Sequence, residues 1–130
     1  MIERIEELEG LYEGTISDGE KHGQGCYLWY NGNFYNGYWE HGKINGLGTL
    51  FYANGGVLKG HFAAGKLAGF GRGMYSNGDT YLGMWKEGMF HGKGLFYIKA
   101  RHLWQLSEFE EGTMTRVINA GEGKPSALSI

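Results

Sequence analysis

The sequence predicts an all-β protein: an elongated, single-layer antiparallel β-meander of tandem β-hairpin repeats, with a short N-terminal helix as a cap. Three observations predict it. Glycines recur every 23 residues, aromatic residues alternate with period two inside each unit, and an Asn-Gly pair closes three of the units. Glycine supplies 25 of the 130 residues and aromatic residues 15%, a composition that excludes a disordered chain.

The N-terminal segment, residues 1–11, is expected to form the cap. Ile2, Ile5 and Leu8 are spaced for one apolar side of a short helix that ends at Gly10.

The four repeats come next, at 12–34, 35–57, 58–80 and 81–103. In the second repeat, Tyr35, Gly37 and Trp39 alternate as in a strand, residues 40–46 read as a turn, and residues 47–52 form a second strand. The pair Asn54-Gly55 then signals the turn to the next repeat. Each repeat is therefore predicted to be a β-hairpin, and residues 12–103 a continuous meander.

The C-terminal part departs from the register. Residues 104–118 fit a degenerate fifth repeat that caps the array, with Phe109 taking the position of Trp39 after a one-residue shift. Residues 119–130 carry few apolar groups and are expected to be a flexible tail.

One face of the predicted ribbon combines large rings with glycines. A ring needs flat backbone to lie on, and covering glycine with an aromatic neighbour stabilises a sheet. The repeat aromatics expected to be structural are Tyr12, Tyr35, Trp39, Phe62, Tyr81 and Trp85. The structural repeat glycines are Gly14, Gly37, Gly60, Gly83, Gly25, Gly48, Gly71 and Gly94.

The opposite face carries the candidate partner-binding residues. Side chains in a strand alternate between faces, so residues out of phase with the rings form a second, partly apolar surface. These residues are Leu28, Phe51, Met74 and Tyr97 in one column, flanked by Tyr38 and Met84. The alternatives are that residues 1–11 or 104–130 fold back over this stripe, or that the stripe packs across a curved sheet.

The repeat pattern Y-x-G-x-W-x-x-G-x-x-x-G-x-G, with His-Gly-x-Gly in two units, resembles the MORN repeat over residues 12–103. Three positions depart from it: Ile16 replaces Trp, Leu58 replaces Tyr, and the fourth unit lacks its Asn-Gly. The resemblance implies a curved β-meander used for attachment to proteins or membranes, as in ciliary and cytoskeletal proteins, lipid kinases and myosin-tail adaptors. Where catalysis occurs in such proteins, a separate domain provides it.

Charge argues against nucleic acid and against strong lipid binding. The net charge is −2, and residues 12–103 carry nine Lys and Arg against six Asp and Glu, a diffuse +3. His22 and His91 lie three repeats apart, so they are too distant to share a metal, and Cys26 has no paired base. We therefore expect no catalytic residues, no metal site and no cofactor.

These observations favour a non-catalytic protein-protein interaction scaffold or adaptor, a subunit of a larger ciliary or cytoskeletal assembly that binds a helix or extended peptide along the ribbon. A phospholipid-binding adaptor with weak anionic-lipid contact and a self-associating structural protein, a homo-oligomer, are the alternatives. The acidic N-terminus is unlike a signal or transit peptide, so a cytoplasmic location is expected, with a cilium, flagellum or the cytoskeleton as the particular site.

Overall fold

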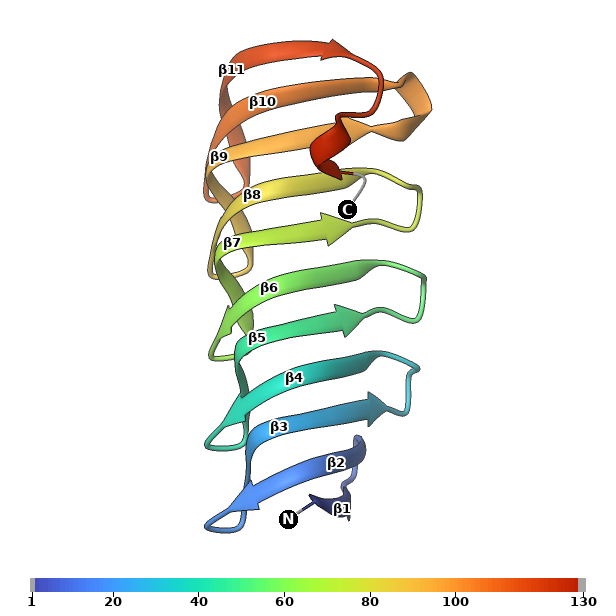
Figure 1. Ribbon diagram of the computed structural model, residues 1–130, viewed down its shortest axis with the longest axis vertical. Helices are drawn as coiled ribbons and strands as arrows, with labels where there is room; N and C mark the ends of the chain where they lie inside the picture. The colour runs from blue at the N-terminus through green and yellow to red at the C-terminus, as the bar shows by residue number, and fades with distance from the viewer. Residues whose placement is uncertain (1, 129–130) are drawn as a thin grey trace.

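A computed structural model describes residues 2–128 and contains one antiparallel sheet, whose eleven strands are neighbours in chain order (Figure 1). The strands are β1 (Ile2–Glu6), β2 (Gly10–Ser17), β3 (Glu20–Trp29), β4 (Phe34–Glu40), β5 (Lys43–Phe51), β6 (Val57–Ala63), β7 (Lys66–Met74), β8 (Thr80–Lys86), β9 (Met89–Ile98), β10 (Leu103–Glu110) and β11 (Thr113–Glu122). Two 3-10 turns, η1 (Lys99–Arg101) and η2 (Ser126–Leu128), are the only helical segments in the described residues. The predicted all-β meander is confirmed.

Two-residue turns close the hairpins on the left side of Figure 1. Both central residues have positive φ, for example +50° at His41 and +79° at Gly42. This is the type I′ geometry, whose twist matches that of the flanking strands. The same geometry recurs at Asp18-Gly19, Ala64-Gly65, Glu87-Gly88 and Glu111-Gly112.

The Asn-Gly pairs lie in the loops on the opposite side, where they connect one hairpin to the next. In each loop the asparagine Oδ1 accepts a hydrogen bond from the backbone N–H two residues further on. These bonds join Asn33 N–H to Asn31 at 3.0 Å, Gly56 N–H to Asn54 at 2.9 Å, and Asp79 N–H to Asn77 at 2.9 Å. The fourth repeat lacks the motif, and η1 makes this connection instead.

The eight repeat glycines form one continuous row across β2–β9. Each lies directly opposite the next, in the order Gly14, Gly25, Gly37, Gly48, Gly60, Gly71, Gly83, Gly94. A Cβ atom at Gly48 would lie 2.1 Å from the Tyr35 hydroxyl oxygen, a distance that no side chain tolerates. Glycine is required there because the tyrosine ring lies flat against the backbone.

The rings stack along this row and form the core. Tyr35 packs edge-on between Trp39 and Phe62, with both ring centroids 5.5 Å away. Its hydroxyl donates to the carbonyl of Tyr38 at 3.1 Å, where a bulge shifts the register of β4 against β5. The hydroxyls of Tyr12 and Tyr81 make the same bond to the third residue after them.

The N-terminal helix cap is not observed, and that prediction was wrong. Ile2–Glu6 forms β1, with Ile2 opposite Thr15 and Glu6 opposite Leu11 on β2. An isolated helix of this length is marginal in water, whereas the free edge of β2 offers a row of unpaired backbone groups. Strand pairing therefore overrides the helical spacing of the isoleucines.

The C-terminal segment is also more ordered than the sequence suggests. The ring of Phe109 on β10 lies 5.6 Å from that of Tyr81, so residues 104–118 extend the ring stack. Instead of a flexible tail from residue 119, the chain completes β11 as far as Glu122 and then forms η2, where Leu128 is buried. The rest of the expected tail, residues 129 and 130, lies outside the described residues.

The glycine row gives a first prediction. Gly48→Ala is expected to lower the free energy of unfolding by about 3 kcal/mol, the upper end of the usual range for overpacking. Gly71→Ala is the matched control, because Leu58 replaces the tyrosine there and the nearest atoms to an added Cβ are 3.2 Å away. It is expected to cost about 1 kcal/mol, the lower end of that range. Urea denaturation measures both, and equal losses would refute the role given to the tyrosine rings.

Candidate functional site

An apolar row crosses the sheet face opposite the rings. Its members lie directly opposite one another on consecutive strands. We name this the outer row, and it comprises Leu11, Leu28, Phe34, Phe51, Val57 and Met74 on β2–β7. Leu28 is 48% exposed, and Phe51 and Met74 are each 43% exposed. The outer row is therefore a continuous apolar surface in contact with solvent.

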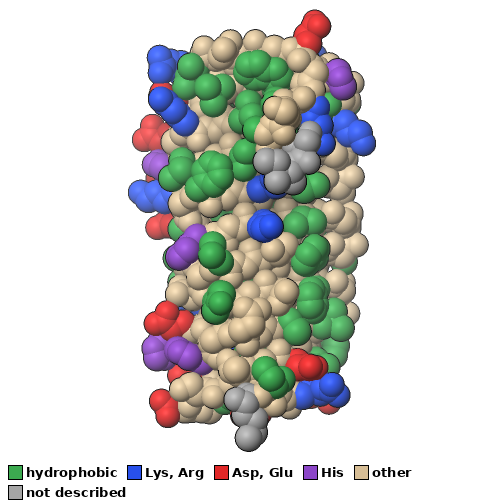
Figure 2. Space-filling model, in the orientation of Figure 1, with side chains coloured by type: hydrophobic (Ala, Val, Ile, Leu, Met, Phe, Trp, Pro, Cys, Tyr) green, Lys and Arg blue, Asp and Glu red, His purple; other side chains and the backbone are tan. Residues whose placement is uncertain are grey.

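A second apolar column lies nearer the type I′ turns. It comprises Tyr38, Leu47, Phe70 and Met84, all exposed. Figure 2 shows the two bands of hydrophobic side chains running along the molecule. Leu47 and Phe70 are absent from the residues predicted above. Their signal is the Gly-x-Gly motif: its glycines face the rings, so the residue between them faces outward.

A more polar row separates the two bands. It runs through Cys26, Asn36, Thr49, Lys59 and Arg72 on consecutive strands. Burial and the nearby carboxylate of Glu13 raise the pKa of the Cys26 thiol. The thiol therefore stays protonated near neutral pH and is not an activated nucleophile.

Tyr97 differs from the other predicted binding residues. It continues the outer row on β9, but it is only 4% exposed and its hydroxyl lies 3.1 Å from Nδ1 of His102. The η2 turn lies in front of β8–β10 in Figure 1, and the carbonyl of Ala127 accepts a hydrogen bond from Arg72 at 3.3 Å. The C-terminal segment thus folds back over one end of this face and leaves the outer row open.

The six repeat aromatics lie on the ring face, where none is more than 6% exposed. Burial raises the pKa of Tyr35 and that of Tyr81 to about 12 in each case, so both phenols stay neutral across the physiological range. These side chains hold the fold, and Trp85 also lines a pocket.

A lysine side chain packs against the aromatic rings at the N-terminal end of the core. The ammonium group of Lys21 lies 2.8 Å from the carboxylate of Glu7 and 5.7 Å from the ring centroid of Trp39. The other carboxylate oxygen of Glu7 accepts a hydrogen bond from the Tyr27 hydroxyl at 2.8 Å. These bonds, led by the one from Lys21, lower the pKa of Glu7 despite its partial burial.

Neither a metal centre nor a membrane helix is present in the described residues. No group of three or more His, Cys, Asp or Glu side chains in residues 2–128 is placed to hold a metal ion. No helix within this range is long and apolar enough to cross a bilayer.

The repeats match a known family model. The MORN repeat model matches residues 12–34, 35–57, 59–80 and 81–99. The chain belongs to the MORN-repeat family. The third match begins one residue after Leu58, the position where this chain departs from the family tyrosine. A search of curated proteins finds no match. MORN repeats generally serve as modules that bind proteins or membranes.

The contact between Glu7 and Lys21 gives a prediction about pH. The folded-state pKa of Glu7 lies below the ordinary value of 4.5, so its carboxylate adds stability above that pH and loses it as the pH falls. Because the Glu7 side chain is 40% exposed, the gain is no more than about 1 kcal/mol. Thermal unfolding of the wild type and Glu7→Gln should differ at pH 6 and converge near pH 3. A difference that stays constant with pH would contradict this assignment.

Proposed function

We propose that this MORN protein is a non-catalytic adaptor or scaffold subunit that binds a protein partner along its outer row. The observation that carries the proposal is the exposed apolar row on β2–β7, which continues over six strands with no charged side chain in it. An exposed apolar stripe of this kind is typical of an interaction site.

The dimensions of this face favour a helical partner. Six neighbouring strands span roughly 24 Å, about the length of a 16-residue helix. Phe34 in the outer row and Tyr38 in the second column are four residues apart on β4, about 13 Å along an extended strand. A helix about 10–12 Å wide with its side chains fits between the two bands, with apolar contacts on both sides.

The experiments described below also distinguish two other functions. A phospholipid-binding adaptor would attach to anionic vesicles in a salt-sensitive way. A self-associating protein would pair its end strands, since β1 and β11 each have one neighbour in the sheet. The diffuse charge of the repeats supports neither lipid binding nor self-association, whereas the exposed apolar row supports binding of a protein partner.

The cellular location is part of the proposal. We place the protein in the cytoplasm, in a ciliary or cytoskeletal assembly, on the basis of family resemblance. Fluorescence imaging of the tagged endogenous protein tests this, and exclusive labelling of another compartment would contradict it.

The variant Phe51→Asp tests the role of the outer row. We expect this variant to keep the fold, because Phe51 is 43% exposed, and to abolish stoichiometric capture of the protein partner from native extract. Thr113→Asp is the matched control, since it adds the same charge at an exposed position on β11, away from the strands that carry the two bands, and it should retain the partner. The measurement is affinity purification in high salt followed by quantitative mass spectrometry.

Three results would contradict the proposal: unfolding of Phe51→Asp, equal capture by both variants, or recovery of lipid alone. Light scattering of the purified protein tests the remaining alternative. A mass that rises with concentration and is unchanged by Phe51→Asp would favour self-association through the end strands.

A further inference from the structure

The third repeat lacks the tyrosine ring that fills the other three. Leu58 occupies the position that Tyr12, Tyr35 and Tyr81 hold in their repeats. Leucine has no ring to lie on the glycine row and no hydroxyl to donate to the bulge carbonyl of His61. In the second repeat, Tyr35 joins the rings of Trp39 and Phe62. No ring contact within residues 2–128 joins Phe62 to Trp85 across Leu58.

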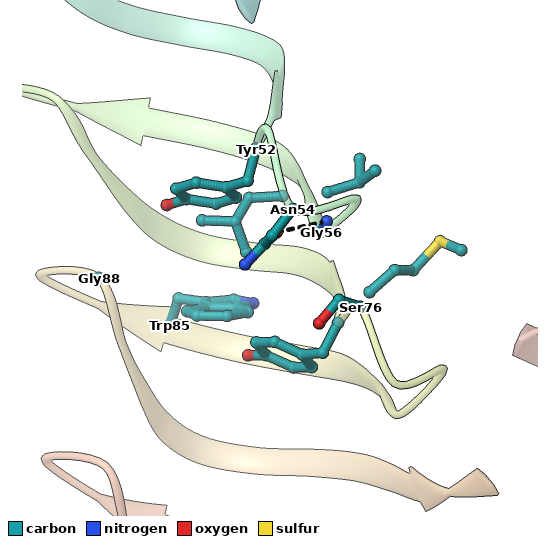
Figure 3. A pocket seen from close by; sticks show the side chains of 10 residues that line it. Tyr52, Asn54, Gly56, Ser76, Trp85 and Gly88 are labelled. Atoms are coloured by element: carbon teal, nitrogen blue, oxygen red, sulfur yellow. Dashed lines mark hydrogen bonds between the residues drawn. The ribbon is translucent and has the colours of Figure 1, made fainter. Parts of the chain in front are cut away.

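A cavity of about 340 Å³ lies beside Leu58, and we name it the repeat-3 pocket. Its principal wall residues are Tyr52, Asn54, Leu58, Tyr75, Ser76 and Trp85 (Figure 3). Aromatic walls with a few polar groups, and a volume in this range, are typical of ligand sites. Tyr52 and Tyr75 are 38% and 37% exposed, so the pocket can be entered from solvent.

Trp85 provides a buried donor without a partner. Two repeats earlier, Nε1 of Trp39 donates to the carbonyl of Gly25 at 3.1 Å. The indole of Trp85 lies instead over Gly71 and Gly73, 3.2 and 3.3 Å from where their Cβ atoms would be. Trp85 is 6% exposed, and its Nε1 has no hydrogen-bond partner among the described residues. Buried donors are normally satisfied, so the pocket calls for an acceptor.

Asn54 supplies a second donor. Its Oδ1 already accepts the N–H of Gly56 at 2.9 Å. In Figure 3 the amide nitrogen of Asn54 points toward the space between the rings of Tyr52 and Trp85. The pocket therefore combines aromatic walls with two N–H donors and suits a flat ring that carries an acceptor.

We propose that the repeat-3 pocket binds a tyrosine side chain of a protein partner, beside the indole of Trp85 that covers Gly71 in this repeat. The ring packs against Tyr52 and Trp85, and the phenol oxygen accepts the Nε1–H of Trp85. Phenylalanine and tryptophan side chains have no suitable acceptor, and tyrosine is frequent at the energetic centres of interfaces. This inference rests on the proposed function for the source of the tyrosine. Val57 and Met74 of the outer row border the pocket, but Phe51 does not line it.

The test is an NMR titration of the 15N-labelled protein with N-acetyltyrosinamide. The indole Nε1–H resonance of Trp85, assigned with Trp85→Phe, should shift to saturation and show an NOE to the ligand ring. N-acetylphenylalaninamide should bind about three to ten times more weakly, the factor that one neutral hydrogen bond provides.

Leu58→Tyr should restore the missing ring, fill the pocket and reduce binding at least tenfold. Leu58→Met is the matched control, which keeps the cavity open and should bind within twofold of the wild type. An unmoved Trp85 resonance, equal affinity for the phenylalanine compound, or undiminished binding to a folded Leu58→Tyr would each overturn the proposal. If Leu58→Tyr does not fold, the NOE between the ligand ring and Trp85 in the wild type still tests the proposal, and its absence would overturn it. Loss of this binding leaves the Phe51→Asp result unaffected, so the two proposals fail separately.

Discussion

The close approach of tyrosine rings to a continuous row of glycines is the constraint on which the rest of the structure depends. Glycine normally weakens a strand, because it adds backbone freedom and buries no side chain. Here Gly25, Gly48 and Gly94 are covered by phenol rings at distances that leave no room for a Cβ atom. The sheet gains its core from rings that lie on its own backbone, and a single layer can therefore stay folded without a second sheet or covering helices.

This arrangement separates the two faces by role. The ring face is filled and its hydroxyls are committed to bulge carbonyls, so it determines the shape of the ribbon. The other face carries exposed apolar residues that lie outside the ring core. At Leu58 the ring face has a pocket instead of a tyrosine ring, and the Nε1 of Trp85 beside it has no hydrogen-bond partner among the described residues.

Much of the fold could be predicted because the 23-residue register carries both the turns and the ring positions. Strand alternation alone predicts that Phe51 and Met74 face outward, and both are exposed. The errors lie where the register ends. The spacing of Ile2 and Ile5 suits a helix, but the edge of β2 binds that segment as a strand. Strand alternation predicts that Tyr97 faces outward with the other members of the row. It lies beside the irregular end of the array, however, where it is buried and contacts His102, and alternation within a strand carries no information about such contacts.

The most direct test of the central claim is hydroxyl-radical footprinting of the endogenous complex against the free protein. The division of roles predicts that Leu28, Phe51 and Met74 lose most of their reactivity in the complex. Trp39 and Tyr35 should react little in either state, because they are buried before any partner binds. Equal reactivity of the outer row in both states, with protection confined to other surfaces, would contradict the account.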